Sequence, residues 1–371
     1  MGLTIVQLLP ALEMGGVERG TVEVAQELCR RGHRAIVISA GGRLENQLRQ
    51  AGAEHVAWPI GAKSPLTFRF VPRLRRFFRR ERVDIVHARS RLPAWLAHFA
   101  LRGMLAARPA FVTTVHGPYS VNRYSAIMTR GDRVIAISRW IERYIRANYP
   151  KVDPARIRVI PRGVDPKIFR HGHVPEAAWR AEFERAFPQT RGKQLLTLPG
   201  RLSRRKGQQD FLSLLRALIQ RQPPVHGLIV GGAHPRRAAY VSELQGMIRN
   251  LGLASQVTMT GPRGDLREIM AISRIVFNLS IEPEGFGRTT LEALSLGVPV
   301  IGYAHSGTAE LLEELYPAGL VATGNQDELL ARTMQFLASP PPVPASHPYT
   351  LQAMLDATMD VYHSLARAQD A

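Results

Sequence analysis

The sequence predicts an α/β protein with two doubly wound domains, each built around a parallel β-sheet. Its 371 residues are enough for two domains of about 150 residues each. In both halves, short apolar runs alternate with amphipathic segments of helical periodicity, which is the pattern of βαβ units. Between the halves lies a stretch with Pro, His and aromatic residues but no clear strand, which is typical of an interdomain segment.

The first half is expected to form six strands, because its apolar runs are short and are bounded by turn-forming or charged residues. Gly15 and Gly16 precede the first helical segment, and Gly32 ends it. The expected strands cover residues 4–9, 35–39, 55–58, 83–87, 111–115 and 133–137, with helices at 17–31, 44–51 and 66–82.

The second half repeats the alternation. Its expected strands cover residues 194–198, 227–230, 257–260, 275–279 and 297–302, with helices at 207–221, 239–250, 289–296 and 351–368. We therefore expect a first domain at 1–165, an interdomain segment at 166–191, a second domain at 192–345, and a terminal segment at 346–371 whose helix packs back toward the first domain. Neither half contains G-x-G-x-x-G, so the usual dinucleotide-binding fingerprint is absent.

Composition excludes several classes of protein. The hydrophobic fraction of 45% and the charged fraction of 21% are ordinary for a folded protein and exclude intrinsic disorder. The single cysteine, Cys29, excludes a disulfide framework and a cysteine-rich zinc site. The sequence shows no basic leader and no apolar window near the ~18 residues of a membrane span, so a cytoplasmic location is expected.

The charge is strongly asymmetric along the chain. Residues 1–165 carry 28 basic and 12 acidic side chains, whereas the remaining 206 residues carry 21 and 18. This excess favours a polyanionic partner for the first half, which would be a nucleic acid, an anionic lipid or a phosphorylated substrate. Frequent use of Arg in a GC-rich genome would account for part of the same excess.

Two segments of the second half carry the most specific chemistry. The first, 284–292, reads Glu-Gly-Phe-Gly-Arg-Thr-Thr-Leu-Glu and runs into an expected helix. Gly285 and Gly287 would let backbone amides approach a ligand at the helix N-terminus, where negative charge is favoured. Glu284 and Glu292 are spaced to face one site, and ionised carboxylates accept hydrogen bonds from neighbouring hydroxyl groups. A capped helix with an incidental acid is the alternative interpretation.

The second segment, 200–207, reads Gly-Arg-Leu-Ser-Arg-Arg-Lys-Gly and follows the first strand of the second half. Arg201 and Lys206 would lie at the carboxyl end of that strand, where doubly wound sheets bind their ligands. Guanidinium and ammonium groups at this place are suited to a diphosphate. A solvated basic loop is the alternative interpretation.

In this order, G-R-L-x-x-x-K-G and E-G-F-G-x-x-x-L-E-A resemble the motifs of the family-4 glycosyltransferases of the GT-B fold. That fold has two Rossmann-like domains facing a central cleft. The resemblance spans nearly the whole chain, and position 162 is Arg where the family commonly has Asn. Further family landmarks match at residues 15–18, 114–117, 135–138 and 159–165.

The resemblance implies a retaining transfer of a sugar from a nucleotide-diphosphate donor, most simply a UDP-hexose. Arg201 and Lys206 match the pair that neutralises the donor's diphosphate, which is also the leaving group. The chain contains no D-x-D sequence. We therefore expect no metal and no other cofactor, with these two cations stabilising the charge that a divalent ion stabilises elsewhere.

The same match gives roles to the other positions. Glu292 corresponds to the acid that holds the ribose hydroxyls, and Glu284 to the group that binds the transferred sugar. His116 would reach that sugar from the first domain, and a core histidine is the alternative interpretation. The remaining donor-binding positions are Gly16, Gly285, Phe286 and Gly287, the last three through their backbone amides.

Region 63–82 contains eight basic residues, with aromatic and leucine side chains at helical spacing among them. One interpretation is an amphipathic helix with a packed aromatic face and solvated arginines. A compatible one adds an anionic membrane surface, to which each basic side chain contributes ~1 kcal/mol. The residues assigned to acceptor or membrane binding are Arg75, Arg76, Arg79, Arg80, Arg89 and Arg91. The last two follow a strand, where they would grip phosphates of the acceptor.

The expected acceptor is a lipid-linked or lipopolysaccharide-core saccharide, that is, a glycolipid or a phosphorylated saccharide. An anionic membrane surface is the expected partner, with the protein peripheral to the inner face of the cytoplasmic membrane. A nucleic-acid-binding protein is the competing class, but the sequence has no helix-turn-helix, zinc-finger or RNA-recognition signature, and paired glutamates would repel phosphates. Within the same fold, a nucleotide-sugar epimerase or a glycogen- or starch-type synthase is a further alternative.

Overall fold

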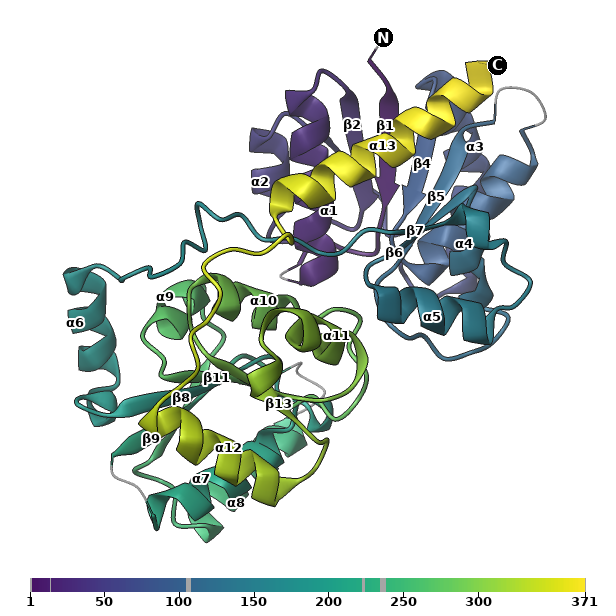
Figure 1. Cartoon of the computed structure of the whole chain (residues 1–371). Coiled ribbons are helices and arrows are strands. Elements are labelled where there is room, and N and C mark those ends of the chain that lie inside the picture. Colours follow the sequence, from purple (N-terminus) through teal and green to yellow (C-terminus); the bar gives the residue numbers. More distant parts are fainter. Residues whose placement is uncertain (1, 14, 105–107, 222–223, 234–237, 371) are drawn as a thin grey trace. The chain divides into compact units, whose positions relative to one another are not determined.

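The computed structural model describes residues 2–13, 15–104, 108–221, 224–233 and 238–370 (Figure 1). They form two compact units, each with helices packed around a parallel sheet. The first unit comprises residues 1–162 and 352–371, and the second comprises residues 163–351. Two doubly wound α/β units are what the alternation of strands and helices predicts.

The sheet of the first unit has seven parallel strands in the order β3-β2-β1-β4-β5-β6-β7. They are β1 (Thr4–Leu8), β2 (Arg34–Ser39), β3 (Glu54–Ala57), β4 (Ile85–Ala88), β5 (Ala110–Val115), β6 (Arg133–Ala136) and β7 (Ile157–Val159). The α-helices are α1 (Gly16–Arg30), α2 (Glu45–Gln50), α3 (Phe70–Arg80), α4 (Arg91–Arg102), α5 (Arg139–Asn148) and α13 (Leu351–Asp370). The strand order reverses between β1 and β4, which makes the unit doubly wound.

The sheet of the second unit has six parallel strands in the order β10-β9-β8-β11-β12-β13. They are β8 (Gln194–Pro199), β9 (Val225–Val230), β10 (Val257–Gly261), β11 (Ile275–Asn278), β12 (Val300–Tyr303) and β13 (Leu320–Val321). The α-helices are α6 (Ala177–Ala186), α7 (Gln208–Ile219), α8 (Ala238–Asn250), α9 (Leu266–Ala271), α10 (Arg288–Ser295), α11 (Ser306–Leu315) and α12 (Gln326–Ala338). Its strand order reverses between β8 and β11.

The basic helix of the first unit is shorter than the expected 66–82, and its packing is as expected. A 3₁₀ turn, η1 (Pro65–Arg69), precedes α3, and Pro72 lies in the first turn of α3, where its missing N–H costs no hydrogen bond. Arg82 has a φ of 49°, so the helix has ended before it. The core face consists of four buried side chains, Phe70, Leu74, Phe77 and Phe78.

Residues 166–191, expected as an interdomain segment, lie within the second unit. They contain α6, whose Phe183 is 2% exposed and packs in a cluster with Leu195, Leu228 and Val230. Trp179 stacks on Phe183 with the ring centroids 5.2 Å apart. The aromatic residues of this stretch therefore cover the sheet of the second unit.

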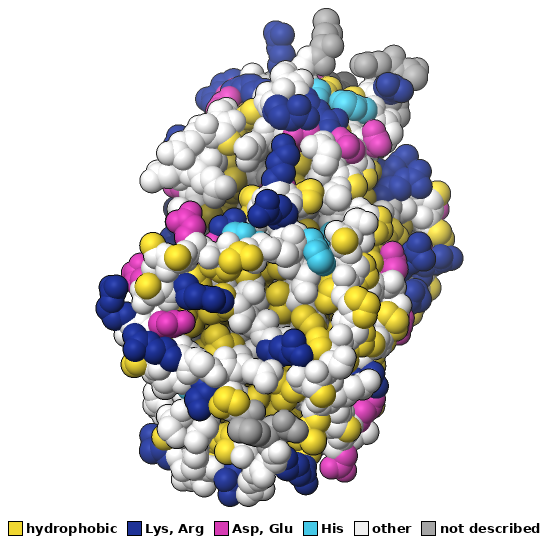
Figure 2. All heavy atoms as spheres, turned by 60° about the vertical axis from the view of Figure 1, so that its left-hand side comes forward, with side chains coloured by type: hydrophobic (Ala, Val, Ile, Leu, Met, Phe, Trp, Pro, Cys, Tyr) yellow, Lys and Arg dark blue, Asp and Glu magenta, His cyan; other side chains and the backbone are white. Residues whose placement is uncertain are grey.

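Basic side chains are spread over the face of the molecule that Figure 2 shows. Figure 2 shows Lys and Arg side chains distributed over one face of the molecule, between hydrophobic and acidic side chains, without a single basic patch. Among the described residues, no helix combines the length and the hydropathy that a membrane span needs. Attraction to a polyanionic surface would therefore depend on particular groups of residues and not on the net charge alone.

The last helix, α13, packs on the first unit through polar contacts with α1. Glu27 of α1 is 5% exposed and accepts hydrogen bonds from Arg30 and Arg31 at 2.7 Å and from Gln352 of α13 at 3.3 Å. Arg31 also pairs with Asp356 of α13. The hydrogen bond from Arg30 outweighs burial, and with the contacts to Arg31 and Gln352 it lowers the pKa of Glu27 to about 2.

We predict that Glu27→Gln lowers the free energy of unfolding by about 1–2 kcal/mol at pH 7. Because folding lowers this pKa from 4.5 to about 2, the stabilisation is complete above pH 4.5 and is lost as the pH falls toward 2. The difference between wild type and variant, measured by urea unfolding, should shrink between pH 7 and pH 3. Glu313→Gln, at an exposed position of α11, is the control and should be neutral at both values. An equal difference in the free energy of unfolding at both pH values would contradict the low pKa assigned to Glu27.

Candidate active site

The carboxyl ends of β8 and β11 form the candidate site of the second unit. The two strands are neighbours, and the sheet order reverses between them. The chain leaves them in segments 200–207 and 279–287, which contain the motifs identified in the sequence. Doubly wound sheets bind ligands at such a reversal, on the carboxyl edge.

The two segments touch backbone to backbone. Gly207 has a φ of 67°, and a Cβ at this position would lie 2.1 Å from the carbonyl oxygen of Leu279. The amide of Ile281 donates to the carbonyl of Arg205 at 2.9 Å. Only glycine satisfies both the left-handed conformation and the close approach at position 207.

Across this contact, Lys206 Nζ donates to Glu284 Oε1 in an ion pair whose side chains are 30% and 18% exposed. The carboxylate also accepts from Ser280 Oγ at 2.7 Å and from Asn278 Nδ2 at 3.2 Å. Burial raises the pKa of Glu284, but the charge of Lys206 and these hydrogen bonds outweigh burial and hold the pKa below its usual range. Glu284 is therefore an ionised acceptor at neutral pH.

A third segment, at the start of α11, holds the backbone of Glu284. Ser306 Oγ accepts from the amide of Glu284, and the amide of Gly307 donates to the carbonyl of Glu284, both at 3.0 Å. A Cβ at Gly307 would lie 2.4 Å from the carbonyl oxygen of Gly285. Sequence reasoning missed these residues. The available signal was Ser-Gly-Thr directly after an expected strand of the same sheet.

The loop then turns into α10. Gly287, with a φ of 88°, is the residue before the helix. Phe286 is 5% exposed and packs edge-on against Tyr349, with ring centroids 5.7 Å apart. Glu292 is 4% exposed and accepts from Arg288 Nε at 3.2 Å. The phenylalanine ring thus anchors the loop before α10.

Arg201 lies on the same edge and differs from Lys206 in its environment. Its side chain is exposed, and within the described part of the chain its guanidinium has no hydrogen bond or ion pair. Its carbonyl accepts from Gln208 Nε2 at 3.1 Å, which holds the backbone of the loop. The structure therefore brings Lys206 and Glu284 together, and Arg201 is an exposed cation of the same loop without an acidic partner among the described residues.

The first unit has the corresponding reversal between β1 and β4. Gly16 starts α1 after β1, and a Cβ there would meet no atom within 4 Å. Arg89 follows β4, but it is 2% exposed and donates through Nε to Gln7 at 2.7 Å. Among the described residues its buried Nη2 has no hydrogen-bond partner, so the expectation that Arg89 contacts an acceptor phosphate stays a prediction. Arg91 is half-buried and donates to Ser125 Oγ at 3.1 Å.

His116 follows β5 and is held by Arg162, whose Nη2 lies 2.8 Å from Nδ1 of the imidazole. A guanidinium only donates, so Nδ1 accepts and the ring proton is on Nε2. Among the described residues, this buried Nε2 has no hydrogen-bond partner. Burial lowers the pKa of His116 well below its usual value, and the charges of Arg162 and Arg89 lower it further. His116 is therefore a neutral ring with an unpartnered N–H donor.

A second buried histidine supports this edge. His87 Nδ1 lies 2.6 Å from the hydroxyl of Tyr362 in α13, and its Nε2 lies 2.6 Å from Thr114 Oγ1. Burial, with smaller contributions from Arg89 and Arg162, lowers the pKa of His87 well below its usual value. Sequence reasoning treated His87 only as a strand residue. Both of its nitrogens are occupied, so it acts as a structural link between the sheet and α13.

The arginines of α3 have different partners. Arg75 and Arg79 donate to carbonyl oxygens of residues 99–103, at the end of α4, over 3.1–3.2 Å. Arg80 pairs with the adjacent glutamate at 2.6 Å. Arg76 is exposed and has no partner among the described residues. Arg75 and Arg79 therefore cap a neighbouring helix, a structural role that the sequence did not suggest.

Similarity to known proteins identifies the family. Residues 14–168 match the family described as Glycosyltransferase Family 4, and residues 180–347 match the one described as Glycosyl transferases group 1. This chain belongs to the family-4 glycosyltransferases. Its GT-B fold is confirmed by a glycosyltransferase from Rickettsia africae ESF-5, which is 28% identical with a TM-score of 0.86, over 98% of each chain.

Two further relatives of this glycosyltransferase are informative. HepE from Anabaena, solved with UDP and glucose, is 22% identical with a TM-score of 0.80, over 98% of this chain and 100% of HepE. A subunit of the human phosphatidylinositol N-acetylglucosaminyltransferase is 26% identical over 319 residues. That match covers 81% of this glycosyltransferase but only 61% of the human protein. Among the described residues, no group of three or more His, Cys, Asp or Glu is placed to hold a metal ion.

We predict that His116 of this glycosyltransferase is neutral at pH 7 and titrates below its usual range, because burial and Arg162 both disfavour its protonation. In Arg162→Gln the positive charge is lost and the amide oxygen can accept from a protonated ring, so the pKa of His116 should rise, although burial still holds it below its usual value. NMR titration with labelled histidine measures this directly. Arg162→Lys, which keeps the charge, should retain the low pKa. A wild-type His116 that titrates near its usual value would contradict the assignment.

Proposed function

We propose that this glycosyltransferase moves a hexose from a UDP-hexose to a lipid-linked or lipopolysaccharide-core saccharide, with retention of anomeric configuration. The observation that carries the proposal is the ion pair of Lys206 and Glu284 at the strand reversal of the second unit. HepE was solved with UDP and glucose, and the human relative belongs to a phosphatidylinositol N-acetylglucosaminyltransferase. These names support a nucleotide-sugar donor and a lipid-linked acceptor.

The charges of the second unit suit the donor's diphosphate. Arg201 is an exposed cation with no acidic partner among the described residues, and Lys206 lies in the same loop. When a diphosphate binds, Lys206 shares its three donors between the phosphate and Glu284. Negative charge grows on the β-phosphate as the sugar departs, and cations already in place stabilise it without reorganisation.

The carboxylates suit the sugar and the ribose. Glu284 is ionised and only partly exposed, so it is placed to accept from hydroxyls of the transferred sugar. The amides of residues 285–287 supply donors on the same loop. Glu292 accepts from Arg288, and its carboxylate is the group proposed to hold the ribose hydroxyls. In the first unit, the Nε2–H of His116 is a donor for a sugar oxygen, and the open space at Gly16 admits phosphate or acceptor.

The reaction that fits these groups takes place on one face of the sugar. The bond from the anomeric carbon to the phosphate oxygen breaks, and the acceptor oxygen bonds to the same carbon from the same side. The acceptor's proton passes to the departing phosphate, so the released product is UDP. Arg201 and Lys206 hold the leaving group, and no metal ion or other cofactor takes part in the proposed step.

The proposal is tested by incubating the full chain with UDP-glucose, GDP-mannose and ADP-glucose, with and without a lipid-linked saccharide acceptor. We expect nucleoside diphosphate release that depends on the acceptor and is fastest with a UDP-sugar. No release with any nucleotide sugar, combined with tight RNA binding, would overturn the proposal in favour of a nucleic-acid-binding protein. Epimerised donor formed without acceptor would instead indicate an epimerase.

Lys206→Ala should slow turnover ~100-fold, equivalent to ~3 kcal/mol of lost leaving-group stabilisation. Arg205→Ala is the matched control, because Arg205 is the adjacent residue, is exposed and pairs only with Glu282 at 3.0 Å among the described residues.

Glu292→Ala should weaken UDP binding ~10-fold, since each lost charge-assisted hydrogen bond costs about 1.5 kcal/mol. Steady-state kinetics and calorimetry measure these effects. Unchanged kinetics for Lys206→Ala and unchanged UDP binding for Glu292→Ala would refute the donor site.

Activity should survive removal of divalent metal ions, because the leaving-group charge is stabilised by Arg201 and Lys206. The measurement is turnover before and after treatment with EDTA, followed by addition of Mg²⁺ or Mn²⁺. We expect less than a twofold change, which corresponds to under ~0.5 kcal/mol in the barrier. Loss of activity that Mn²⁺ or Mg²⁺ restores would show that a metal stabilises the leaving group.

A further inference from the structure

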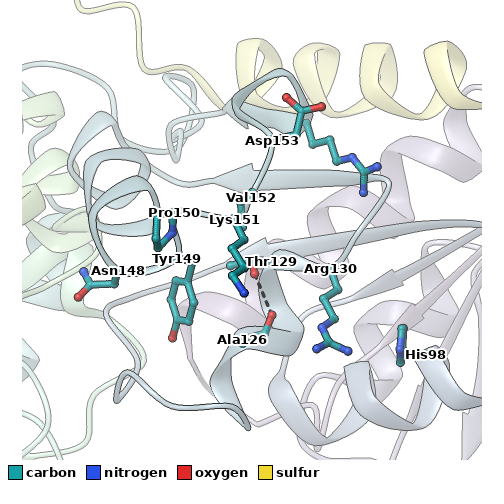
Figure 3. A pocket seen from close by; sticks show the side chains of 11 residues that line it. His98, Ala126, Thr129, Arg130, Asn148, Tyr149, Pro150, Lys151, Val152 and Asp153 are labelled. Carbon is teal, nitrogen blue, oxygen red and sulfur yellow. Dashed lines mark hydrogen bonds between the residues drawn. The ribbon is translucent and has the colours of Figure 1, made fainter.

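The first unit contains a cavity of about 670 Å³ that belongs neither to a strand reversal nor to a sequence motif. It lies between α4, the 3₁₀ turn η2 (Ser125–Thr129) and the loop after α5 (Figure 3). Segments 126–130 and 148–156 of its lining precede β6 and β7, whereas His116 follows β5. Since all these strands are parallel, the cavity lies toward the amino-terminal ends of the strands, away from the candidate active-site edge.

The lining of this cavity carries more positive than negative charge. Arg130, Lys151 and Arg156 line it, and within the described residues none of them has an ion pair with an acid. The acid of the lining, Asp153, accepts from the amide of Ala155 at 2.9 Å. In Figure 3, Lys151 and Arg130 run in the same direction, whereas Asp153 points away from them. Holding cations around a concave space costs free energy that a bound anion would recover.

Positive charges near the cavity also affect the pKa of His98 in α4. It lines the cavity and is half-buried. Burial lowers the pKa of His98, and the charges of Arg130, Arg102 and Arg108 lower it further. Protonation of His98 is therefore disfavoured first by burial and then by the neighbouring cations.

An exposed apolar ridge adjoins the cavity. We define it as Leu66, Phe68, Trp95 and Phe99. Leu66 is 71%, Phe68 48% and Phe99 36% exposed. Phe99 stacks on Trp95 at 5.3 Å and lies 6.2 Å from Phe68. Arg130, a cavity residue, lies 5.6 Å from the ring of Trp95, so the ridge and the cavity share a wall.

We propose that this cavity binds the phosphate of an anionic phospholipid while the ridge enters the headgroup layer of the membrane. The inference rests on the lipid-linked acceptor of the proposed function, and it assigns the residues that contact the membrane surface. Apolar and aromatic side chains beside cations are the composition of interfacial membrane sites. Leu66, the most exposed residue of the ridge, is aliphatic and offers no face for base stacking, which favours a lipid. The three aromatic rings of the ridge suit a headgroup layer and would also suit base stacking, so RNA is included in the test.

Vesicle sedimentation of the full chain tests the cavity. Wild type should bind vesicles of phosphatidylcholine with 30% phosphatidylglycerol and should not bind phosphatidylcholine alone. Lys151→Gln and Arg130→Gln should each weaken binding about fivefold, and Phe68→Ser should weaken it similarly. Arg158→Gln is the matched control: it removes one charge at an exposed position two residues after a cavity residue, and Arg158 does not line the cavity. It should change binding less than twofold.

NMR of labelled histidine separates a lipid from a free anion. Dihexanoyl phosphatidylglycerol below its micelle concentration should raise the pKa of His98, because a bound phosphate cancels the potential of Arg130. An equal rise with inorganic phosphate at the same concentration would show a free-anion site and overturn the lipid assignment. Competition by RNA for vesicle binding would overturn it in favour of nucleic acid.

Equal effects of Lys151→Gln and Arg158→Gln on vesicle binding would show that only the total charge of the protein matters. That result would refute the cavity as the lipid-binding site. The acceptor-dependent release of UDP is a separate readout. The cavity variants should leave that release unchanged on a soluble acceptor, so failure of the cavity and failure of the proposed function are distinguishable. Loss of UDP release on a soluble acceptor in Lys151→Gln would also refute a role confined to the membrane surface.

Discussion

The ion pair of Lys206 and Glu284 is the interaction on which the candidate site depends. A carboxylate as enclosed as Glu284 is tolerated only where charge and hydrogen bonds compensate its loss of water. That compensation comes from the loops after β8 and β11, with the start of α11 holding the backbone. Each segment follows a different strand, so the site exists only when the sheet has assembled, and the contact at Gly207 sets how closely the loops approach.

The candidate residues of the two units differ in their charge state. In the second unit a cation and an acid are paired and remain ionised, which suits charge that moves with a diphosphate. In the first unit His116 is kept neutral by burial and by Arg162, and its N–H is left without a partner among the described residues. One unit therefore offers charge, and the other offers a fixed neutral donor.

Sequence alone predicted the parts of the fold and site that depend on local signals. Segments 200–207 and 284–292 contain glycine turns beside strands, and this combination indicates a ligand-binding edge wherever it occurs. The contact of Ser306 with Glu284 escaped prediction because the residues are 22 apart and meet only through the pairing of β11 with β12. Arg89 was placed correctly at a strand end, but its burial depends on Gln7, which is 82 residues away. Partners of this kind are specified by the tertiary fold.

The most direct measurement of the central claim is a crystal structure of the full chain with UDP-hexose. We predict that the diphosphate lies ~3 Å from Lys206 Nζ and the Arg201 guanidinium, with a hydroxyl of the hexose hydrogen-bonded to Glu284. We also predict that Lys206 keeps or shares its contact with Glu284 and does not move away from it. A nucleotide bound elsewhere, with the Lys206–Glu284 pair unchanged and Arg201 still solvated, would contradict the account.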